Sequence, residues 1–119
     1  MQIETILSDQ IARYLDLAST QTKLTAANMA NVDTPGYKAM GVDFEGEMRA
    51  AIDGVEAENG QQPVKVRFED NLIARPDGNN VSMDRESLNL AEAQLKFKTG
   101  VAILRQQYQT VMDAIHADK

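Results

Sequence analysis

Residues that interrupt helices are confined to the middle of this chain of 119 residues. All three prolines and six of the seven glycines lie between positions 33 and 83, and the two flanks contain only Gly100. Proline lacks a backbone donor and glycine adds conformational freedom, so both are rare inside helices. The sequence therefore predicts three segments: an N-terminal helix over 1–32, a turn-rich acidic insert over 33–83 and a C-terminal helix over 84–119.

In both flanks, residues that would share one side of a helix recur at alternating intervals of three and four positions, and most of them are apolar. Such a narrow stripe is typical of a coiled-coil seam. We predict a mainly α fold in which the two terminal helices pair as an antiparallel coiled coil, joined by a small mixed loop and β insert. The apolar members of this assembly seam are Leu7, Tyr14, Leu17 and Leu24 in the first flank, and Leu90, Phe97, Val101, Leu104, Tyr108, Val111 and Ile115 in the second.

Two helices with narrow stripes bury only part of their apolar surface, and an isolated pair is usually marginal in stability. One hypothesis is that neighbouring copies or related subunits cover the remaining stripe, so that the helices become ordered on assembly. The alternative is a self-contained helical hairpin that acts as a soluble adaptor or chaperone. Gly100 leaves two interpretations open: a tolerated helix defect costing about 1 kcal/mol, or the close approach of a neighbouring helix.

The insert contains two turns, a short helix and a candidate strand. Thr34-Pro35-Gly36-Tyr37 predicts a type II turn, and residues 76–80 predict a second turn. We expect a helix over 44–52, an exposed loop over 58–62 and a strand over 64–68. The alternating acids Asp43, Glu45 and Glu47 are interpreted as a solvated acidic edge of a strand.

Composition excludes several classes of function. A net charge of -6 disfavours nucleic acid as a partner, and the absence of cysteine removes disulfides and thiolate chemistry. No apolar run is long enough to span a membrane. The first residues do not show a basic segment followed by an apolar stretch, so we predict no cleaved secretory signal. The single histidine, His116, is predicted to be an exposed residue near the end of a helix. We predict no enzyme activity, catalytic residue, cofactor or metal site.

Residues 26–38, AANMANVDTPGYK, resemble the N-terminal signature of the bacterial flagellar axial proteins, which include rod, hook and hook-associated proteins. The resemblance extends over about residues 10–48 and 76–115, and within the family it is nearest to a proximal rod subunit. A neighbouring FlgC-type rod protein is the alternative within the family. The signature residues are Asn28, Asn31, Thr34, Pro35, Gly36 and Tyr37.

This resemblance implies a structural subunit of the basal-body rod, the drive shaft and export channel of the flagellum. In that family the terminal helices form an inner tube and the middle segment forms an outer layer. The implied partners are other copies of the chain, FlgC-like and FliE-like rod proteins, and the flagellar type III export gate. The implied location is the rod in the periplasmic space, reached by type III export without a cleaved signal peptide.

A second resemblance concerns Phe44 and Met48, an aromatic and an apolar residue four positions apart. This spacing is similar to the short gate-recognition motif of early flagellar export substrates. Two such residues also lie on one side of a helix, so simple packing explains the pair equally well. Both interpretations, export-gate motif and packing contact, remain open from the sequence.

Overall fold

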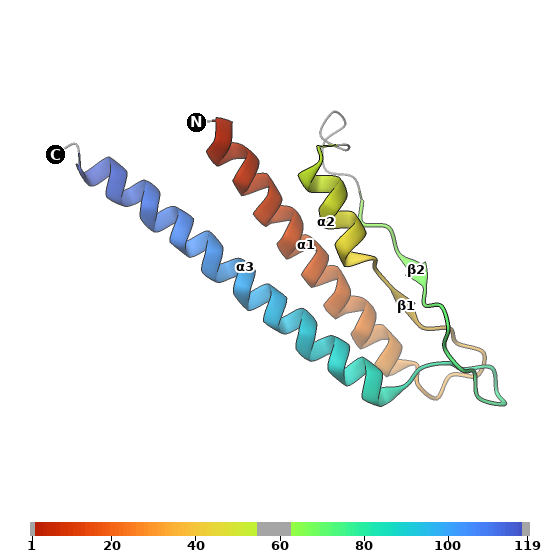
Figure 1. The fold of residues 1–119 in the computed structure, drawn as a ribbon. Helices are drawn as coiled ribbons and strands as arrows, with labels where there is room; N and C mark the ends of the chain where they lie inside the picture. Colours follow the sequence, from red (N-terminus) through yellow and green to blue (C-terminus); the bar gives the residue numbers. More distant parts are fainter. Residues whose placement is uncertain (1, 55–62, 118–119) are drawn as a thin grey trace.

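The computed structural model describes residues 2–54 and 63–117, and its two longest elements are the terminal helices (Figure 1). Along the chain the elements are α1 (Gln2–Ala30), β1 (Met40–Gly41), α2 (Phe44–Ile52), β2 (Arg67–Phe68) and α3 (Met83–Ala117). The molecule is a rod-like body with principal extents of 68 × 28 × 17 Å. The predicted loop over 58–62 lies outside the described residues.

Helices α1 and α3 run antiparallel and pack along their length, with both ends of the chain at the same end of the molecule (Figure 1). The small insert, with α2 and a two-stranded antiparallel ribbon, lies beside α1. This arrangement confirms the predicted fold class. The two long helices form because their sequences contain no proline and only one glycine, Gly100. Ser82 also caps α3 through a 3.4 Å hydrogen bond from the Arg85 amide.

Three contacts fix the axial register of the two long helices. Asn28 meets Glu86 near the turn-rich end, and Gln107 donates to Ser8 over 3.1 Å near the chain termini. Between them, Gly100 is buried, and a Cβ built there would lie 2.6 Å from Cδ2 of Leu15. The glycine therefore marks a close approach of the helices, which favours the second of the two interpretations offered by the sequence.

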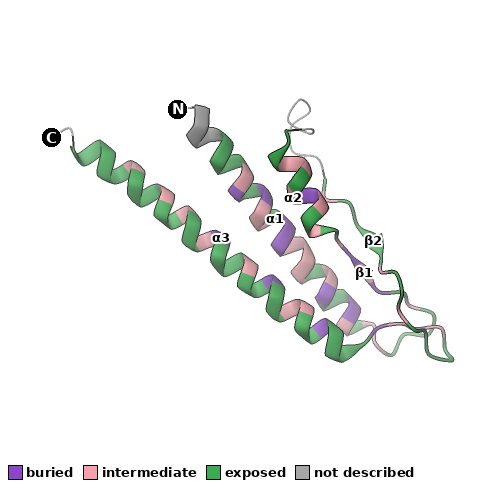
Figure 2. Cartoon of the chain, viewed as in Figure 1, coloured by how far each residue is buried: buried purple, intermediate pink, exposed green. Residues whose placement is uncertain are grey.

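The buried core follows α1, which is covered on two sides (Figure 2). One side packs against α3 and the other against α2 and β1. Leu17 and Ala18 are fully buried, as is Ala93 on α3. Burial is concentrated toward the insert end: no residue of α3 beyond Gly100 is buried in the described range 101–117.

The insert departs from two expectations drawn from sequence alternation. The predicted helix over 44–52 is confirmed, but the predicted strand over 64–68 forms only its last two residues, Arg67 and Phe68. The acids at 43–47 lie at the start of helix α2 rather than on a strand edge. Asp43 caps α2, and Glu47 is buried in an ion pair of 2.8 Å with Arg13, because helical spacing turns it toward α1.

Candidate functional site

The signature turn follows the end of α1 and adopts the backbone that its sequence predicts. The Tyr37 amide donates to the Thr34 carbonyl over 3.2 Å, and Gly36 has a φ of +76°. That left-handed φ at the third position of a type II turn favours glycine. The chain thereby leaves the helix axis and enters the insert.

A second turn, over residues 76–80, packs directly on the signature turn. The Gly36 amide donates to the Asp77 carbonyl over 2.9 Å. A Cβ built on Gly78, itself at a φ of +87°, would lie 3.4 Å from the Gly36 Cα, so the two backbones are in close contact. We call this pair of turns, with the side chains that tie them to α1 and α3, the turn junction.

Asn28 is the central polar residue of the turn junction and is almost fully buried. Its amide nitrogen donates to the Met40 carbonyl (2.9 Å) and to Glu86 Oε2 (3.2 Å). Its amide oxygen accepts from the Met40 amide (3.0 Å) and from the Tyr37 hydroxyl (3.1 Å). One side chain of α1 therefore connects the signature turn, β1 and the start of α3, with its hydrogen-bonding capacity used in full.

Asn79 connects the two turns in the same way from the opposite side. Its fully buried amide donates to the carbonyls of Asn31 and Thr34, each over 2.9 Å, and its oxygen accepts from the Val81 amide over 2.8 Å. Arg75 adds hydrogen bonds to the carbonyls of Val32 and Val81. Backbone carbonyl and amide groups that lie outside the helices thus form hydrogen bonds with side chains in the turn junction.

Glu86 is a buried carboxylate that the sequence interpretation missed as a contact. The residue lies in the first turn of α3 and is almost fully buried, with Asn28 as a hydrogen-bond partner. Burial raises the pKa of Glu86 above its ordinary value, and the hydrogen bond from Asn28 opposes that change. Glu86 lies four residues before Leu90, on the seam side of α3, and this spacing is the feature of the sequence that could have predicted its burial.

We expect Glu86→Gln to remove a pH dependence from the free energy of unfolding. Because the folded pKa of Glu86 is raised, its ionisation opposes folding, so its contribution weakens stability as pH rises from the unfolded pKa through the folded one. Glutamine keeps an oxygen for Asn28 without the charge, so the variant should be at least as stable at pH 7. Urea unfolding of both proteins from pH 4 to pH 8 measures the difference; a constant gap across this range would contradict the prediction.

The structure divides the predicted assembly seam into covered and open positions. Leu17 is buried and six further residues are half-buried, namely Tyr14, Leu24, Leu90, Val101, Leu104 and Val111. Four residues are exposed: Leu7, Phe97, Tyr108 and Ile115. The innermost line of α3 instead passes through the small residues Ala93 and Gly100, so part of the predicted stripe lies on the shoulder of the contact.

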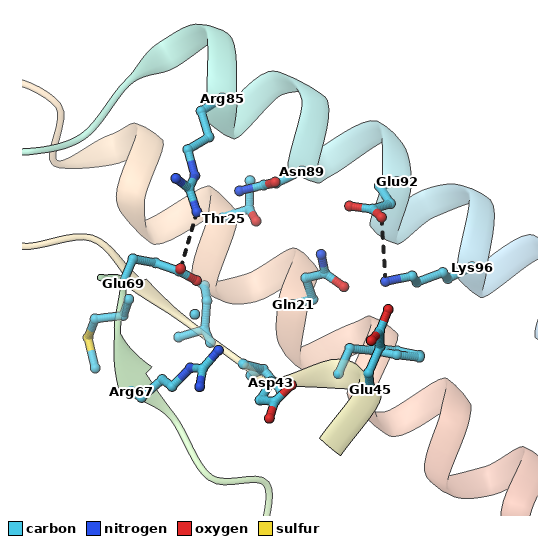
Figure 3. Close-up of a pocket in the computed structure, with 15 residues that line it drawn as sticks. Gln21, Thr25, Asp43, Glu45, Arg67, Glu69, Arg85, Asn89, Glu92 and Lys96 are labelled. Atoms are coloured by element: carbon cyan, nitrogen blue, oxygen red, sulfur yellow. Dashed lines mark hydrogen bonds and ion pairs between the residues drawn. The ribbon is translucent and has the colours of Figure 1, made fainter. Parts of the chain in front are cut away.

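A shallow pocket of about 240 Å³ lies between the two long helices and the ribbon of the insert (Figure 3). Two ion pairs lie in its charged lining: Arg85 meets Glu69 at 3.2 Å and Lys96 meets Glu92 at 3.8 Å. Gln21 also lines it, and its buried oxygen has no hydrogen-bond partner within residues 2–54 and 63–117. No group of metal-ligating side chains occurs in that described part of the chain.

Phe44 and Met48 lie on α2 and are both half-buried. The Phe44 ring meets Tyr14 edge to face, with centroids 5.2 Å apart, and the Lys96 ammonium lies 4.0 Å from its centroid. The pair thus shares a helix that packs on α1, which agrees with a packing contact and leaves the export interpretation untested.

Comparison with known proteins connects this arrangement to a family. A family model described as "Flagella basal body rod protein" matches residues 15–38, the second half of α1 and the signature turn. The flagellar basal body rod protein FlgB of Salmonella typhimurium is 32% identical, over 85% of this chain and 86% of its own length. FlgB of Borrelia hermsii is 34% identical over 93% of this chain and 96% of its own. The chain belongs to the FlgB family of flagellar basal body rod proteins.

Family membership makes this chain a structural subunit of the basal-body rod that assembles with other flagellar components. Proteins of this family are structural rather than catalytic, which agrees with the sequence interpretation. The relatives named here are FlgB proteins, so neither a FlgC-type identity nor a soluble adaptor is favoured. Within the described residues, no helix is both long and apolar enough to cross a membrane.

Proposed function

We propose that this rod subunit polymerises through its terminal helices, which form the inner tube of the rod, while the insert forms the outer layer. The polymer serves as drive shaft and export channel. The observation that carries the proposal is the uneven closure of the helix pair. The turn junction is tied by buried hydrogen bonds, whereas the end bearing the chain termini presents exposed apolar side chains.

The open end of the helix pair carries apolar residues from both helices. Because Ser8 lies opposite Gln107, the residues near position 7 and those beyond position 107 share this end. Its exposed large apolar residues are Ile6, Leu7, Tyr108, Met112 and Ile115. Exposed large apolar residues gathered at one end of a molecule are typical of an interaction surface. We infer that neighbouring subunits cover them.

The remaining partners and the route to the rod follow from the family resemblance. The proposed neighbours are further copies of the chain, a FlgC-like rod protein on one side and a FliE-like protein on the other. The proposed location is the periplasmic rod, reached through the flagellar type III export gate without a cleaved signal peptide. Passage as an unfolded chain suits a helix pair whose open end has few buried contacts.

We expect Tyr108→Asp to block incorporation into the rod while leaving the folded subunit intact. Tyr108 is 66% exposed, so a charge there costs the monomer little, but a neighbouring subunit would have to bury that charge. Swimming in soft agar and the amount of the subunit in purified basal bodies measure the effect, with a loss of about tenfold or more expected. Far-ultraviolet circular dichroism checks that the helices remain.

Thr110→Asp is the matched control, because it adds the same charge to the same end of α3 at an exposed polar position. The Thr110 hydroxyl bonds only to the Gln106 carbonyl of its own helix in the described structure. Normal incorporation of this control, together with loss for Tyr108→Asp, supports a polymer built on the apolar seam. Normal swimming of the Tyr108 variant would count against the proposal.

We also propose that Phe44 and Met48 act as a gate-recognition motif during export, before they pack in the folded subunit. Phe44→Ala is then expected to lower secretion several-fold. Tyr14→Ala is the matched control, because it removes the ring that meets Phe44 at 5.2 Å and keeps the motif. Immunoblots of secreted and cellular protein measure both. Equal secretion of the two variants would leave Phe44 with a packing role only.

A further inference from the structure

Helix α3 has an outer face that points away from α1 and carries exposed leucines. Gly100 faces Leu15 of α1, and a position two residues along a helix lies about 200° around it, so Ala102 faces outward. Residues at helical spacing from Ala102 share its face. Leu88 and Leu95 are 70% and 66% exposed there. The outer face of α3 consists of Leu88, Ala91, Leu95 and Ala102, flanked by the exposed bases Lys98 and Arg105.

Helix α1 has a third face that neither α3 nor the insert covers. Its members recur at intervals of three and four residues, and all are exposed except Ser19, which is half-buried. They are small or charged: Asp9, Ala12, Asp16, Ser19, Lys23, Ala26 and Ala30. Small side chains allow a second helix to approach closely and leave space for larger side chains from it.

We propose that the third face of α1 in one copy packs against the outer face of α3 in a second copy of this chain. This inference rests on the proposed polymerisation and names the surfaces that make one of its contacts. The two faces match in size, because Leu95 stands opposite Ser19 and Leu88 opposite Ala26 when the helices run antiparallel. The leucines then fill the space that the small residues leave.

Charge complementarity supports the same alignment. With Ala12 opposite Ala102, Asp9 stands opposite Arg105 and Asp16 opposite Lys98. Farther along, Lys23 stands opposite Ala91, so the complementarity rests on the pairs of Asp9 with Arg105 and of Asp16 with Lys98. Within residues 2–54 and 63–117, Asp9, Lys23, Lys98 and Arg105 make no hydrogen bond or ion pair, and Asp16 makes a 3.6 Å pair with Arg13. The proposed contact thus gives charged partners to Asp9, Lys98 and Arg105, which have none within the described residues of one copy.

The alignment has a geometric consequence. It is within one residue of the register inside a single copy, where Ser8 meets Gln107 and Leu15 lies against Gly100. Neighbouring copies therefore point in the same direction at nearly the same axial level. Since the two faces differ, the contact is heterologous and each copy retains one free face of each kind. Such a contact continues into a ring or a tubular array, and it cannot stop at a symmetric dimer.

Site-specific cross-linking tests this contact, because the chain contains no cysteine. Two differently tagged variants, Ala12→Cys and Ala102→Cys, are produced together in the native bacterium after deletion of its own copy, and purified basal bodies are oxidised. Both changes are small and at exposed positions. We expect a disulfide between the two tags, since facing positions come within bonding range. Ala12→Cys with Ala91→Cys is the control, about 16 Å out of register, and should give at least about tenfold less product.

A charge exchange provides the second readout. Arg105→Glu alone should lower the Ala12–Ala102 cross-link about tenfold, because it opposes Asp9 with a like charge. Both tagged variants carry Arg105→Glu in this test, and adding Asp9→Lys to both should restore the cross-link. The two side chains lie on faces of one copy that do not meet, so rescue reports on a contact between copies.

The outcomes separate this contact from the proposed function. If both cysteine variants enter the basal body but cross-link only out of register, or only to a different rod protein, the contact between copies is wrong and the rod role stands. If wild-type chain is absent from basal bodies, the proposed function fails as well. A cross-link in register with rescue by the double exchange establishes the interface.

Discussion

Replacing Asn28 by alanine is expected to destabilise the folded subunit by about 3–5 kcal/mol. The change removes four hydrogen bonds at one buried position. It leaves the Met40 amide and carbonyl and the Tyr37 hydroxyl without their partner, and it leaves the Glu86 carboxylate in a buried site with less support. Unsatisfied buried polar groups cost about 1–3 kcal/mol each, so the effects accumulate. Urea unfolding monitored by circular dichroism at 222 nm measures the loss.

Asn31→Ala is the matched control from the same signature. The Asn31 side chain donates to the Ala27 carbonyl and accepts from the Thr34 hydroxyl, both in exposed positions. Its contact with Asn79 uses the backbone carbonyl, which alanine keeps. We expect a loss of no more than about 1 kcal/mol. Similar losses for both variants would mean that Asn28 does not organise the turn junction.

The contrast between these two asparagines shows which features of the fold the sequence periodicity could predict and which it could not. Asn28 follows the seam residue Leu24 by four positions, so the alternating spacing places it on the same stripe, and the structure buries it. Helix boundaries and the signature turn followed from glycine and proline, because backbone conformation there is a local property. The mutual docking of the two turns could not be predicted in this way, because it depends on hydrogen bonds between distant parts of the sequence, such as those from Asn79 to Asn31 and Thr34.

Short polar segments were the other source of error, and for one physical reason. Alternation of acidic residues at 43–47 favoured a strand edge, yet Asp43 caps a helix through the Gly46 amide at 3.2 Å. Capping and the pairing of Glu47 with Arg13 outweigh a pattern of only three residues. The extent of β2 was likewise overestimated, since its only strand partner in the described residues is β1, two residues long.

The predicted seam also illustrates a difference between a stripe and a contact. Spacing identified a stripe on α3, but the closest approach to α1 occurs where Ala93 and Gly100 permit it. Large residues such as Tyr108 are consequently displaced to the shoulder and remain exposed. A stripe wider than one partner can cover is what a subunit with several helical neighbours requires. The position of small residues, rather than of large ones, decides which part is used within one chain.

Replacing Leu17 by aspartate should unfold the subunit and abolish motility. Leu17 has no exposed surface, and it lies on α1, the helix that packs against both α3 and the insert. Truncating a buried leucine costs about 2–5 kcal/mol, and an unpaired carboxylate in the same space adds the cost of burying a charge. A helix pair whose open end contributes few buried side chains has little reserve against such a loss.

The measurements are the ellipticity at 222 nm of the purified chain and swimming in soft agar. Leu95→Asp is the matched control, since it places the same substitution on a helix surface that is 66% exposed. We expect the control to keep its helical signal and melting temperature, while its incorporation into the rod falls because the outer face of α3 is altered. Loss of helix in Leu17→Asp with retention in Leu95→Asp would separate the residues that fold one copy from those that join copies. Retained helix in both variants would show that the core of the pair does not depend on Leu17.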